Sequence, residues 1–258
     1  MLFKIIDFSK FSSIKIGPKV DVLIIEKNDI MPKDRYMIGH GNNLLVSPNP
    51  PPLMMLGNDF DFMEIKDNYL YVGCATTTGR LLSFAKKYDL SGFEFISKLP
   101  GSIGGMVAMN AGVKEYEIFN ILDSIKIDGQ WIDAKLIEHG YRFAKLNGIA
   151  TEVKFKLEKG FNKELLDSLI SLRNNQPKIP SAGSLFKNPP NDYAGRLIED
   201  VGLKGKQIGG MAWSEVHANF LVNKGGGTFE DAINLINLAK KLVLEQYEIA
   251  LKEEVKIL

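Results

Sequence analysis

Alternating apolar and polar positions dominate the first 160 residues of the chain. Runs rich in β-branched and aromatic side chains predict strands at residues 20–26, 36–38 and 151–157. Paired runs predict hairpins over residues 61–73 and 124–132, which turn at Asp67-Asn68 and at Asp128-Gly129. An Asp-Gly pair between two alternating runs is one of the strongest local signals of a hairpin. We therefore expect a strand-rich first part.

Apolar residues recur at three- and four-residue spacing in three segments. This spacing predicts helices at residues 80–88, 163–173 and from Thr228 to about Ala250. Thr228 is followed three residues later by Asp231, the arrangement of a capping box at a helix start. The proline-rich residues 47–52 suit a connector, because proline lacks the backbone donor that helices and central strands require. The fold class predicted from these patterns is α+β, with a change of character near residue 160.

Composition and charge exclude several classes of protein. The 258 residues are 45% hydrophobic and 24% charged, as in ordinary globular proteins. The formal net charge of +1 lacks the basic excess of a nucleic-acid-binding protein. With Cys74 as its one cysteine, the chain forms no internal disulfide and no zinc site built on several cysteines. No signal peptide and no apolar run of membrane-spanning length is visible, so we expect a cytoplasmic protein without a membrane partner.

Glycine is concentrated in four segments, at residues 39–43, 99–105, 110–112 and 209–210. Such clusters mark forced backbone shapes, and one use of these is a cradle whose N–H groups bind phosphate. Tight turns are the alternative for each cluster taken alone. None of the segments has the pattern of a Rossmann fingerprint or a P-loop, so both nucleotide-binding folds are disfavoured.

The order of these segments resembles one family, the UDP-N-acetylenolpyruvoylglucosamine reductases, in its compact subgroup. The resemblance rests on collinear pieces along nearly the whole chain, at residues 13–17, 39–46, 100–105, 110–112, 141–142, 181–189, 194–199, 202–205, 217–220 and 254–255. Any one piece is a weak signal, whereas so many pieces in one order are a strong one.

The resemblance implies a two-subdomain FAD-binding module of the vanillyl-alcohol-oxidase type and an α+β substrate-binding domain. We place the module at residues 1–160, with subdomains at about 1–50 and 51–160. The substrate-binding domain then covers residues 161–258, with a C-terminal tail that returns to the active site. The implied reaction is NADPH-dependent reduction of the enolpyruvyl ether of UDP-N-acetylglucosamine to UDP-N-acetylmuramate through noncovalent FAD, a step of peptidoglycan precursor synthesis. No metal is implied.

Three residues match the catalytic positions of the family. Arg142 can bind the substrate carboxylate, because guanidinium forms two parallel hydrogen bonds and stays charged. Ser184 matches the proton donor, a role that a weakly acidic hydroxyl fills only against a very basic carbon. Glu254 can orient the arginine or donate a hydrogen bond, and the Glu-Val step selects it over Glu253. Without the resemblance, each would be read as a surface or turn residue.

The binding residues also follow from the resemblance. For FAD they are Gly39, Gly41, Asn42, Asn43, Leu44, Pro100, Gly101, Ser102, Ile103, Gly104, Asn110 and Gly112, with the glycine N–H groups facing the diphosphate. For the substrate they are Tyr141, Lys187, Asn188 and Glu199. His217 is a weaker candidate. His40 raises the idea of covalent FAD, but the family holds FAD noncovalently. The departures from the family pattern are Pro18, Asn42, Val113-Lys114-Glu115 and Ala144.

Two other functions stay open at this point. A flavin oxidoreductase with another substrate would keep the first two glycine clusters without Ser184, Lys187 and Asn188 together. A flavin- or nucleotide-binding protein without catalysis would bind flavin that NADPH does not reduce.

Overall fold

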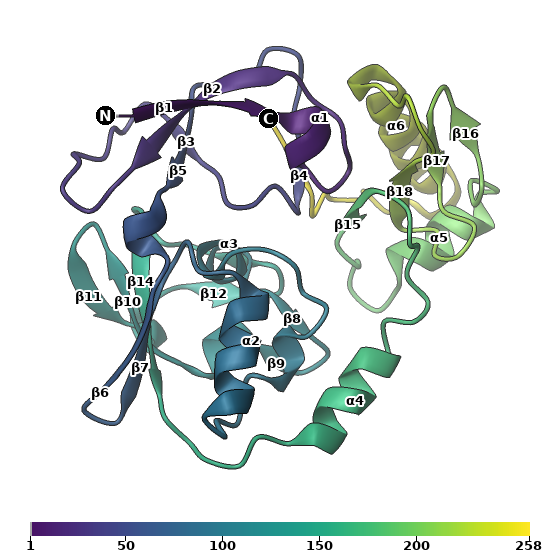
Figure 1. The fold of residues 1–258 in the computed structure, drawn as a ribbon. Helices are drawn as coiled ribbons and strands as arrows, with labels where there is room; N and C mark the ends of the chain where they lie inside the picture. Colours follow the sequence, from purple (N-terminus) through teal and green to yellow (C-terminus); the bar gives the residue numbers. More distant parts are fainter. Residues whose placement is uncertain (1) are drawn as a thin grey trace. The chain divides into compact units, whose positions relative to one another are not determined.

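The computed structural model describes residues 2–258, and these residues form two compact units (Figure 1). Unit 1 contains the start of the chain up to Lys4, Val22–His40 and Leu53–Asn174. Unit 2 contains Ile5–Asp21, Gly41–Pro52 and Asn175–Leu258. Each unit has its own hydrophobic core. The chain thus passes between the units several times before residue 60.

Strands and helices alternate irregularly along the chain, which makes the fold α+β as expected. The strands are β1 (Leu2–Asp7), β2 (Lys19–Ile25), β3 (Tyr36–Met37), β4 (Leu44–Leu45), β5 (Leu53–Leu56), β6 (Met63–Lys66), β7 (Tyr69–Gly73), β8 (Gly112–Val113), β9 (Tyr116–Glu117), β10 (Leu122–Ile127), β11 (Gln130–Asp133), β12 (His139–Gly140), β13 (Phe143–Ala144), β14 (Ala150–Lys156), β15 (Ser181–Ser184), β16 (Gln207–Ile208), β17 (Met211–Trp213), β18 (Phe220–Asn223) and β19 (Lys256–Ile257). The helices are α1 (Phe8–Phe11), α2 (Thr78–Lys87), α3 (Ile103–Ala108), α4 (Lys163–Ser171), α5 (Ala194–Asp200) and α6 (Phe229–Tyr247).

Unit 1 is built around an antiparallel sheet of order β11-β10-β14-β7-β6. Its core packs apolar side chains of these strands against α2 and α3, with Val72, Val153 and Phe155 from the sheet fully buried. A second sheet has the order β1-β2-β5-β3, in which β5 runs parallel to β2 and to β3. In Figure 1 the elements of unit 1 run from purple in β1 to green in α4.

Both predicted hairpins are confirmed. Strands β6 and β7 pair across a turn whose two residues, Asp67 and Asn68, have φ of 50° and 64°. Strands β10 and β11 pair across Asp128 and Gly129, with φ of 47° and 83°. Positive φ at both central residues matches the twist of the flanking strands, and aspartate, asparagine and glycine tolerate it best.

The predicted helices are confirmed with small shifts of their ends. Helix α2 begins two residues earlier than expected, because the Thr77 hydroxyl accepts a hydrogen bond from the Arg80 N–H and caps it. Helix α6 has the predicted capping box of Thr228 and Asp231. It ends at Tyr247 rather than Ala250, since Glu248 adopts a left-handed conformation with φ of 58°.

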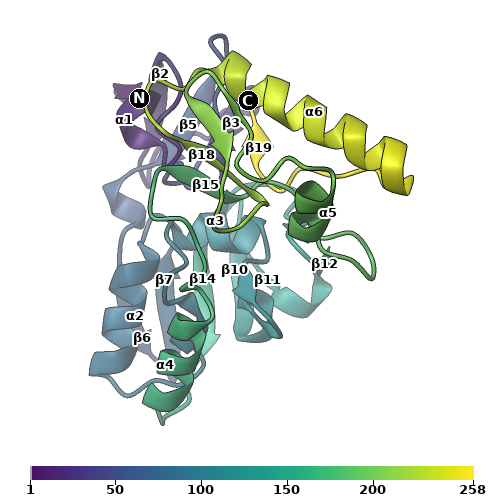
Figure 2. The same ribbon diagram turned by 90° about the vertical axis from the view of Figure 1, so that its right-hand side faces the viewer.

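Unit 2 combines a four-stranded antiparallel sheet, of order β15-β18-β17-β16, with α5 and α6. Helix α6 packs on β16 and β17, and Figure 2 shows its full length. Trp213 in β17 is fully buried, and its ring stacks on Phe186 at a centroid distance of 6.0 Å. The last strand, β19, runs parallel to β4 and ties residues 44–45 into this unit.

The boundary of the compact units does not fall at residue 160. Residues 5–21 and 41–52 belong with the C-terminal segment, and residues 161–174 belong with unit 1. Compact units are defined by internal contacts and not by bound ligands. The division into an FAD-binding module and a substrate-binding domain therefore stays a prediction.

Candidate functional site

Two of the predicted cofactor segments meet in unit 1. A Cβ placed on Gly39 would lie 2.7 Å from the hydroxyl oxygen of Ser102, a distance that real side chains do not reach. Ser102 caps α3, its hydroxyl accepting from the Gly105 N–H at 3.2 Å. Glycine at position 39 is therefore required for the two segments to approach each other.

The glycine segment at 101–104 pairs with the chain just before α2. The Thr78 N–H donates to the Gly101 carbonyl at 3.1 Å, and the Ile103 N–H donates to the Thr76 carbonyl at 2.9 Å. The Gly104 N–H donates to the Cys74 carbonyl at 2.9 Å. The expectation that each glycine amide faces a diphosphate is therefore wrong for Gly104, whose donor is bonded to the protein. The role of this glycine is close approach, because a Cβ here would lie 3.1 Å from that of Cys74.

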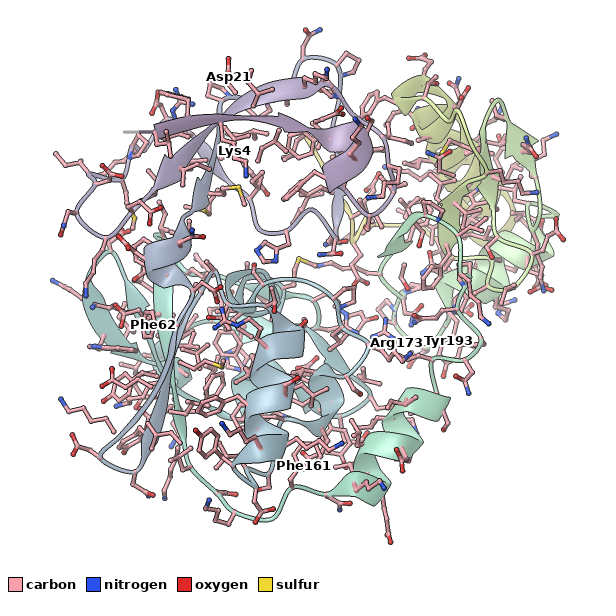
Figure 3. The ribbon with its side chains drawn as sticks, in the orientation of Figure 1. Lys4, Asp21, Phe62, Phe161, Arg173 and Tyr193 are labelled. Atoms are coloured by element: carbon pink, nitrogen blue, oxygen red, sulfur yellow. The ribbon has the colours of Figure 1, made fainter. Side chains whose placement is uncertain are left out.

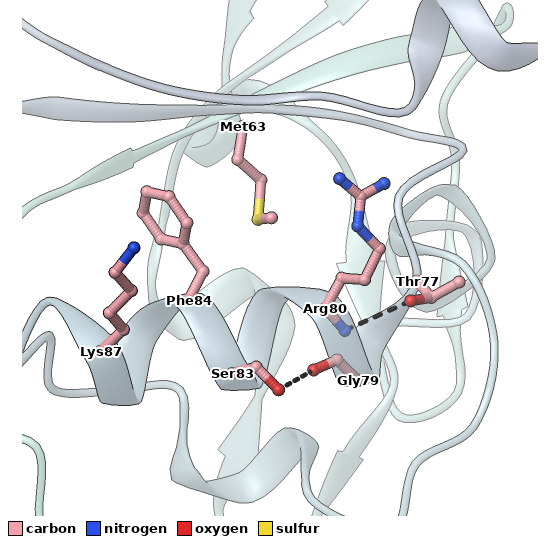
Figure 4. A pocket seen from close by; sticks show the side chains of 7 residues that line it. All are labelled: Met63, Thr77, Gly79, Arg80, Ser83, Phe84 and Lys87. Carbon is pink, nitrogen blue, oxygen red and sulfur yellow. Dashed lines mark hydrogen bonds between the residues drawn. The ribbon is translucent and has the colours of Figure 1, made fainter.

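The threonine run at 76–78 supports this loop and was missed at the sequence level. Thr76 is fully buried and its hydroxyl donates to the Phe62 carbonyl at 3.1 Å; Phe62 is labelled in Figure 3. Thr77 forms a bridge with Ser102 and lines a pocket on α2 with Arg80 and Phe84 (Figure 4). Three consecutive threonines at the start of an amphipathic helix were a usable signal, because the last position before a helix, here Thr77, favours such caps.

The rest of the first glycine cluster lies in unit 2, where it holds the C-terminal tail. The Asn43 side-chain amide donates to the Glu254 carbonyl at 3.0 Å, and the Lys256 N–H donates to the Asn43 carbonyl at 3.0 Å. Leu44 in β4 pairs with Lys256 in β19. The Ser13 hydroxyl donates to the Asn42 carbonyl at 3.2 Å. Asn43, predicted to bind FAD, therefore also fixes the segment that carries Glu254.

Ser184 ends a strand that contains a β-bulge. Along β15 three residue steps separate Ser181 from Ser184, whereas their partners Val222 and Phe220 are two steps apart. Gly183 lies inside this bulge with φ of 86°, a conformation that glycine adopts without strain. An extra residue turns the following side chain to a new direction, and such bulges are frequent beside active sites.

The C-terminal tail runs next to Ser184. The Glu254 N–H donates to the Leu185 carbonyl at 2.7 Å, and the Lys187 N–H donates to the Lys252 carbonyl at 2.9 Å. These bonds place the backbone of Glu254 beside the residue that follows Ser184. Two of the three predicted catalytic residues, 70 positions apart in the sequence, therefore lie together within unit 2.

The first of the two adjacent glutamates of the tail forms an ion pair. The Glu253 carboxylate accepts a hydrogen bond from the Lys240 ammonium of α6 at 2.8 Å. Glu253 thus ties the tail to α6, as a structural ion pair. The choice of Glu254 as the catalytic candidate, which the resemblance made on the Glu-Val step, stays a prediction.

Asn219 is a second residue that the sequence did not single out. It is buried, its side-chain oxygen accepts from the Phe186 N–H at 3.0 Å, and its amide donates to the Phe186 carbonyl at 2.8 Å. Its own carbonyl accepts from the Leu185 N–H at 2.8 Å. One side chain thereby satisfies both backbone groups of Phe186 and holds the chain directly after Ser184.

The predicted substrate residues of unit 2 differ in their partners. The Asn188 side-chain oxygen accepts from the Ala194 N–H at 3.1 Å, and so joins the loop to the start of α5. Glu199 on α5 is exposed and pairs with Lys204 at 2.7 Å. That ion pair gives Glu199 a structural explanation at the surface, and its substrate role stays a prediction, as does that of Lys187.

Arg142 lies in unit 1, in a cluster with other predicted residues. It occupies the turn between β12 and β13 with φ of 59°, and its side chain donates to the Gly112 carbonyl at 3.0 Å. The guanidinium carbon lies 4.9 Å from the ring centre of Tyr141. Fully buried Asn110 and exposed Tyr141 complete the set, with Glu117 joining it.

Partial burial lowers the pKa of the His40 and His217 side chains, because a half-buried imidazole is harder to charge. For His217 the positive charge of Lys204 lowers the pKa further, whereas a backbone hydrogen bond raises it in part. Its Nδ1 accepts from the Asn219 N–H at 3.3 Å, a bond that a protonated ring could not accept. The fold therefore favours the neutral form of His217, which lies three residues before β18.

We expect this neutral His217 to make the protein acid-sensitive. Because its folded pKa is lower than its unfolded value near 6.5, the unfolded chain binds more protons below that pH. The stability it contributes is complete above about pH 6.5 and is lost as the pH falls below that value. Urea unfolding at pH 7 and pH 5 is expected to show a smaller acid loss in His217→Gln than in the wild type. Equal losses would contradict this role.

Residues 2–258 contain neither a membrane-spanning helix nor a group of metal-ligating side chains. Within that range no helix is long and apolar enough to cross a membrane. Over the same residues no three histidine, cysteine, aspartate or glutamate side chains lie together as metal ligands do.

The residues present fit a flavin nucleotide. Gly39 and Ser102 bring two turns together so closely that a Cβ on Gly39 has no room, and this close approach of two glycine-rich segments is compatible with a phosphate cradle. The other half of the predicted set, from Gly41 to Leu44, lies against the tail in unit 2.

Comparison with known proteins covers the whole chain. A family model described as "UDP-N-acetylenolpyruvoylglucosamine reductase, C-terminal domain" matches residues 175–258. The UDP-N-acetylenolpyruvoylglucosamine reductase of Helicobacter pylori strain J99 is 43% identical over the full length of both chains. That of Campylobacter jejuni strain RM1221 is 45% identical over 98% of this chain and 100% of its own. The solved structure of the reductase from Thermus caldophilus matches with a TM-score of 0.86 at 29% identity, over 100% of this chain and 99% of its own.

Proposed function

This chain belongs to the UDP-N-acetylenolpyruvoylglucosamine reductase family, and from that premise we propose its cofactor, its hydride donor and the roles of its residues. It is an FAD-dependent oxidoreductase, a UDP-N-acetylmuramate dehydrogenase, of the reduction step in peptidoglycan precursor synthesis. Its α+β fold contains an FAD-binding module of the vanillyl-alcohol-oxidase type. The proposal is that noncovalent FAD and NADPH serve the reduction of UDP-N-acetylglucosamine enolpyruvate.

The observation that carries the proposal is the contact of Glu254 with the Ser184 segment. The tail reaches residues 185–187 through three backbone hydrogen bonds, although it is separated from them by the whole of α6 and its sheet. The matched family region includes both residues. A proton donor and a carboxylate on neighbouring rigid segments are what the protonation of a carboxylate-stabilised carbon requires.

Bound FAD supplies hydride transfer, which the protein side chains cannot perform. Arg142 is proposed to bind the carboxylate of the enolpyruvyl group. Its fork geometry suits a planar carboxylate, and its permanent charge stabilises the negative charge that builds up there during reduction. The Gly112 carbonyl accepts a hydrogen bond from one of its terminal nitrogens and so contributes to the position of the guanidinium.

Ser184 is proposed to donate the proton that completes the saturated lactyl ether. The bulge at Gly183 and the Asn219 contacts with Phe186 hold its backbone from both sides. A hydroxyl held in one direction can protonate one face of the carbon and so set its configuration. Glu254 is proposed to orient the groups around the carboxylate, and the Asn43 amide bond to its carbonyl fixes the backbone that carries it.

The substrate is a UDP-sugar, for which Tyr141, Lys187, Asn188 and Glu199 are the proposed contacts. Lys187 is the natural partner for a diphosphate, because an ammonium binds phosphate as a point charge. Asn188 is proposed to contact the sugar through its amide group, since its oxygen is bonded to Ala194. We propose further that residues 1–160 bind FAD, residues 161–258 bind the sugar, and the reaction takes place in the cytoplasm.

An anaerobic titration of the purified holoprotein tests the proposal. Addition of NADPH is expected to bleach the flavin absorbance band, and subsequent addition of the enolpyruvyl UDP-sugar to restore it, with formation of UDP-N-acetylmuramate. Bleaching without recovery would show that the protein is a flavoprotein that NADPH reduces, but that the enolpyruvyl UDP-sugar is not its substrate. A flavin band that NADPH leaves unchanged would favour a binding protein without catalysis or another hydride donor, which a parallel NADH titration would separate.

A further inference from the structure

Glu117 connects two of the predicted site residues in unit 1. One oxygen of its carboxylate accepts from the Asn110 side-chain amide at 2.7 Å. The other oxygen lies 3.9 Å from a terminal nitrogen of Arg142. The carboxylate is partly buried, with 23% of the side chain exposed, so solvent screens this ion pair only in part.

The position of Glu117 is fixed by a very close approach of two strands. Glu117 in β9 pairs with Gly112 in β8 across the two-residue turn Lys114-Glu115. A Cβ on Gly112 would lie 2.1 Å from the Tyr116 carbonyl oxygen and 2.8 Å from the Glu117 Cα. Glycine at position 112 therefore allows β9 to approach, and this approach carries the Glu117 carboxylate to Arg142.

Asn110 anchors the carboxylate from the other side. Its side chain is fully buried, its amide also donates to the Gly140 carbonyl at 3.1 Å, and its oxygen accepts from the Phe119 N–H at 3.3 Å. An amide bonded through both of its ends cannot rotate without breaking these bonds. The Glu117 oxygen that it holds is therefore a fixed point.

One terminal nitrogen of Arg142 is hydrogen-bonded and the other lies at ion-pair distance from Glu117. The first donates to the Gly112 carbonyl at 3.0 Å. A guanidinium is a rigid plane, so a hydrogen bond to one terminal nitrogen and an opposite charge beside the other together favour one orientation of the plane.

We propose that Glu117 is a positioning residue for Arg142, holding its guanidinium in the orientation that binds the substrate carboxylate. This inference deepens the proposed function and rests on the carboxylate-binding role of Arg142. The negative charge of Glu117 also offsets part of the positive charge of Arg142. Glu117 therefore orients the guanidinium but weakens its attraction for the substrate carboxylate. Glu117 itself does not contact the reacting atoms.

Because Glu117 both orients Arg142 and weakens its charge, Glu117→Gln is expected to slow the reaction without weakening substrate binding. The rate at which the enolpyruvyl UDP-sugar restores the NADPH-bleached flavin band is expected to fall about 10- to 100-fold, because a misplaced catalytic group typically has a cost of this size. The dissociation constant of the same sugar, measured by calorimetry on the oxidised protein, is expected to stay equal or decrease. Bleaching by NADPH is expected to change less than about twofold, since Arg142 acts on the carboxylate.

Glu115→Gln is the matched control, because Glu115 is an exposed residue of the same hairpin and the substitution is the same. It is expected to behave as the wild type in all three measurements. Glu117→Asp keeps the charge on a shorter side chain and is expected to recover part of the lost rate. If Glu117→Gln does not fold, as judged by its thermal midpoint, the aspartate variant decides, and wild-type kinetics in it would overturn the proposal.

Two further outcomes would also overturn it. Equal recovery rates in Glu117→Gln and Glu115→Gln would exclude a positioning role. A parallel loss of rate, sugar affinity and thermal stability would identify a structural residue instead. Failure of the proposed function is distinguishable from both, because then the sugar does not restore the flavin band in the wild type either.

Discussion

Replacing Ser184 by alanine is expected to slow restoration of the flavin band by the enolpyruvyl UDP-sugar about 10³-fold, the typical contribution of a positioned proton donor. Bleaching of the band by NADPH should stay within about twofold of the wild type, because the hydroxyl has no part in that half of the reaction. Stopped-flow absorbance, with NADPH and the sugar added in separate experiments, measures the two halves independently. The large effect is expected because the bulge at Gly183 sets the backbone position from which the Ser184 hydroxyl projects.

Ser181→Ala is the control for this experiment. Ser181 lies in the same strand, three residues earlier and before the bulge. Its replacement by alanine removes the same group, a serine hydroxyl. Its variant is expected to restore the band at the wild-type rate. If both variants were slow, the effect would come from the strand and not from a proton donor. A fast Ser184→Ala would reject the assignment of the proton donor.

Replacing Glu254 by glutamine is expected to slow the same step about 10²-fold, comparable to the loss of one preorganised electrostatic group in an active site. The neighbouring change, Glu253→Gln, is expected to leave the rate nearly unchanged. It should instead reduce the unfolding free energy by up to about 1 kcal/mol, because it weakens the partly exposed pair with Lys240.

Glu253 and Glu254 form an internally matched pair, since they are adjacent residues with the same side chain. Stopped-flow rates and urea unfolding of both variants provide a complete comparison. The expected pattern is a crossover, in which one variant loses rate and the other loses stability. The reverse pattern, with the rate lost in Glu253→Gln, would show that Glu253 and not Glu254 supplies the catalytic carboxylate. Equal, small losses of rate in both variants would show that neither glutamate of the tail takes part in catalysis.

The sequence predicted those parts of the fold whose causes are local. The turn at Asp128-Gly129 and the capping box of Thr228 with Asp231 each need only residues within a few positions of one another. Their side chains determine the backbone geometry whatever surrounds them. Helix α3 was missed, because its first residues belong to a glycine cluster that also suits a turn.

Site residues were named from collinear motifs, so their identities came without their contacts. The motif places Glu254 one residue after Glu253, but nothing in the sequence shows that Lys240 binds the first of them. The same applies to Gly104, for which the motif suggested a phosphate donor and the fold uses its N–H to bond Cys74. A motif records which residues recur and not which atoms they contact.

By itself, then, the sequence determined the α+β class, the hairpins and long helix, and the identity of a candidate set including Arg142 and Ser184. The tertiary structure alone decided the partners: Asn43 holding the tail 211 residues away, and Asn219 holding Phe186 at a separation of 33. The same is true of Glu117, which meets Arg142 only because Gly112 lets two strands approach. Local side-chain and backbone preferences act over a few residues, whereas contacts between distant segments depend on how the whole chain packs, which no single segment encodes.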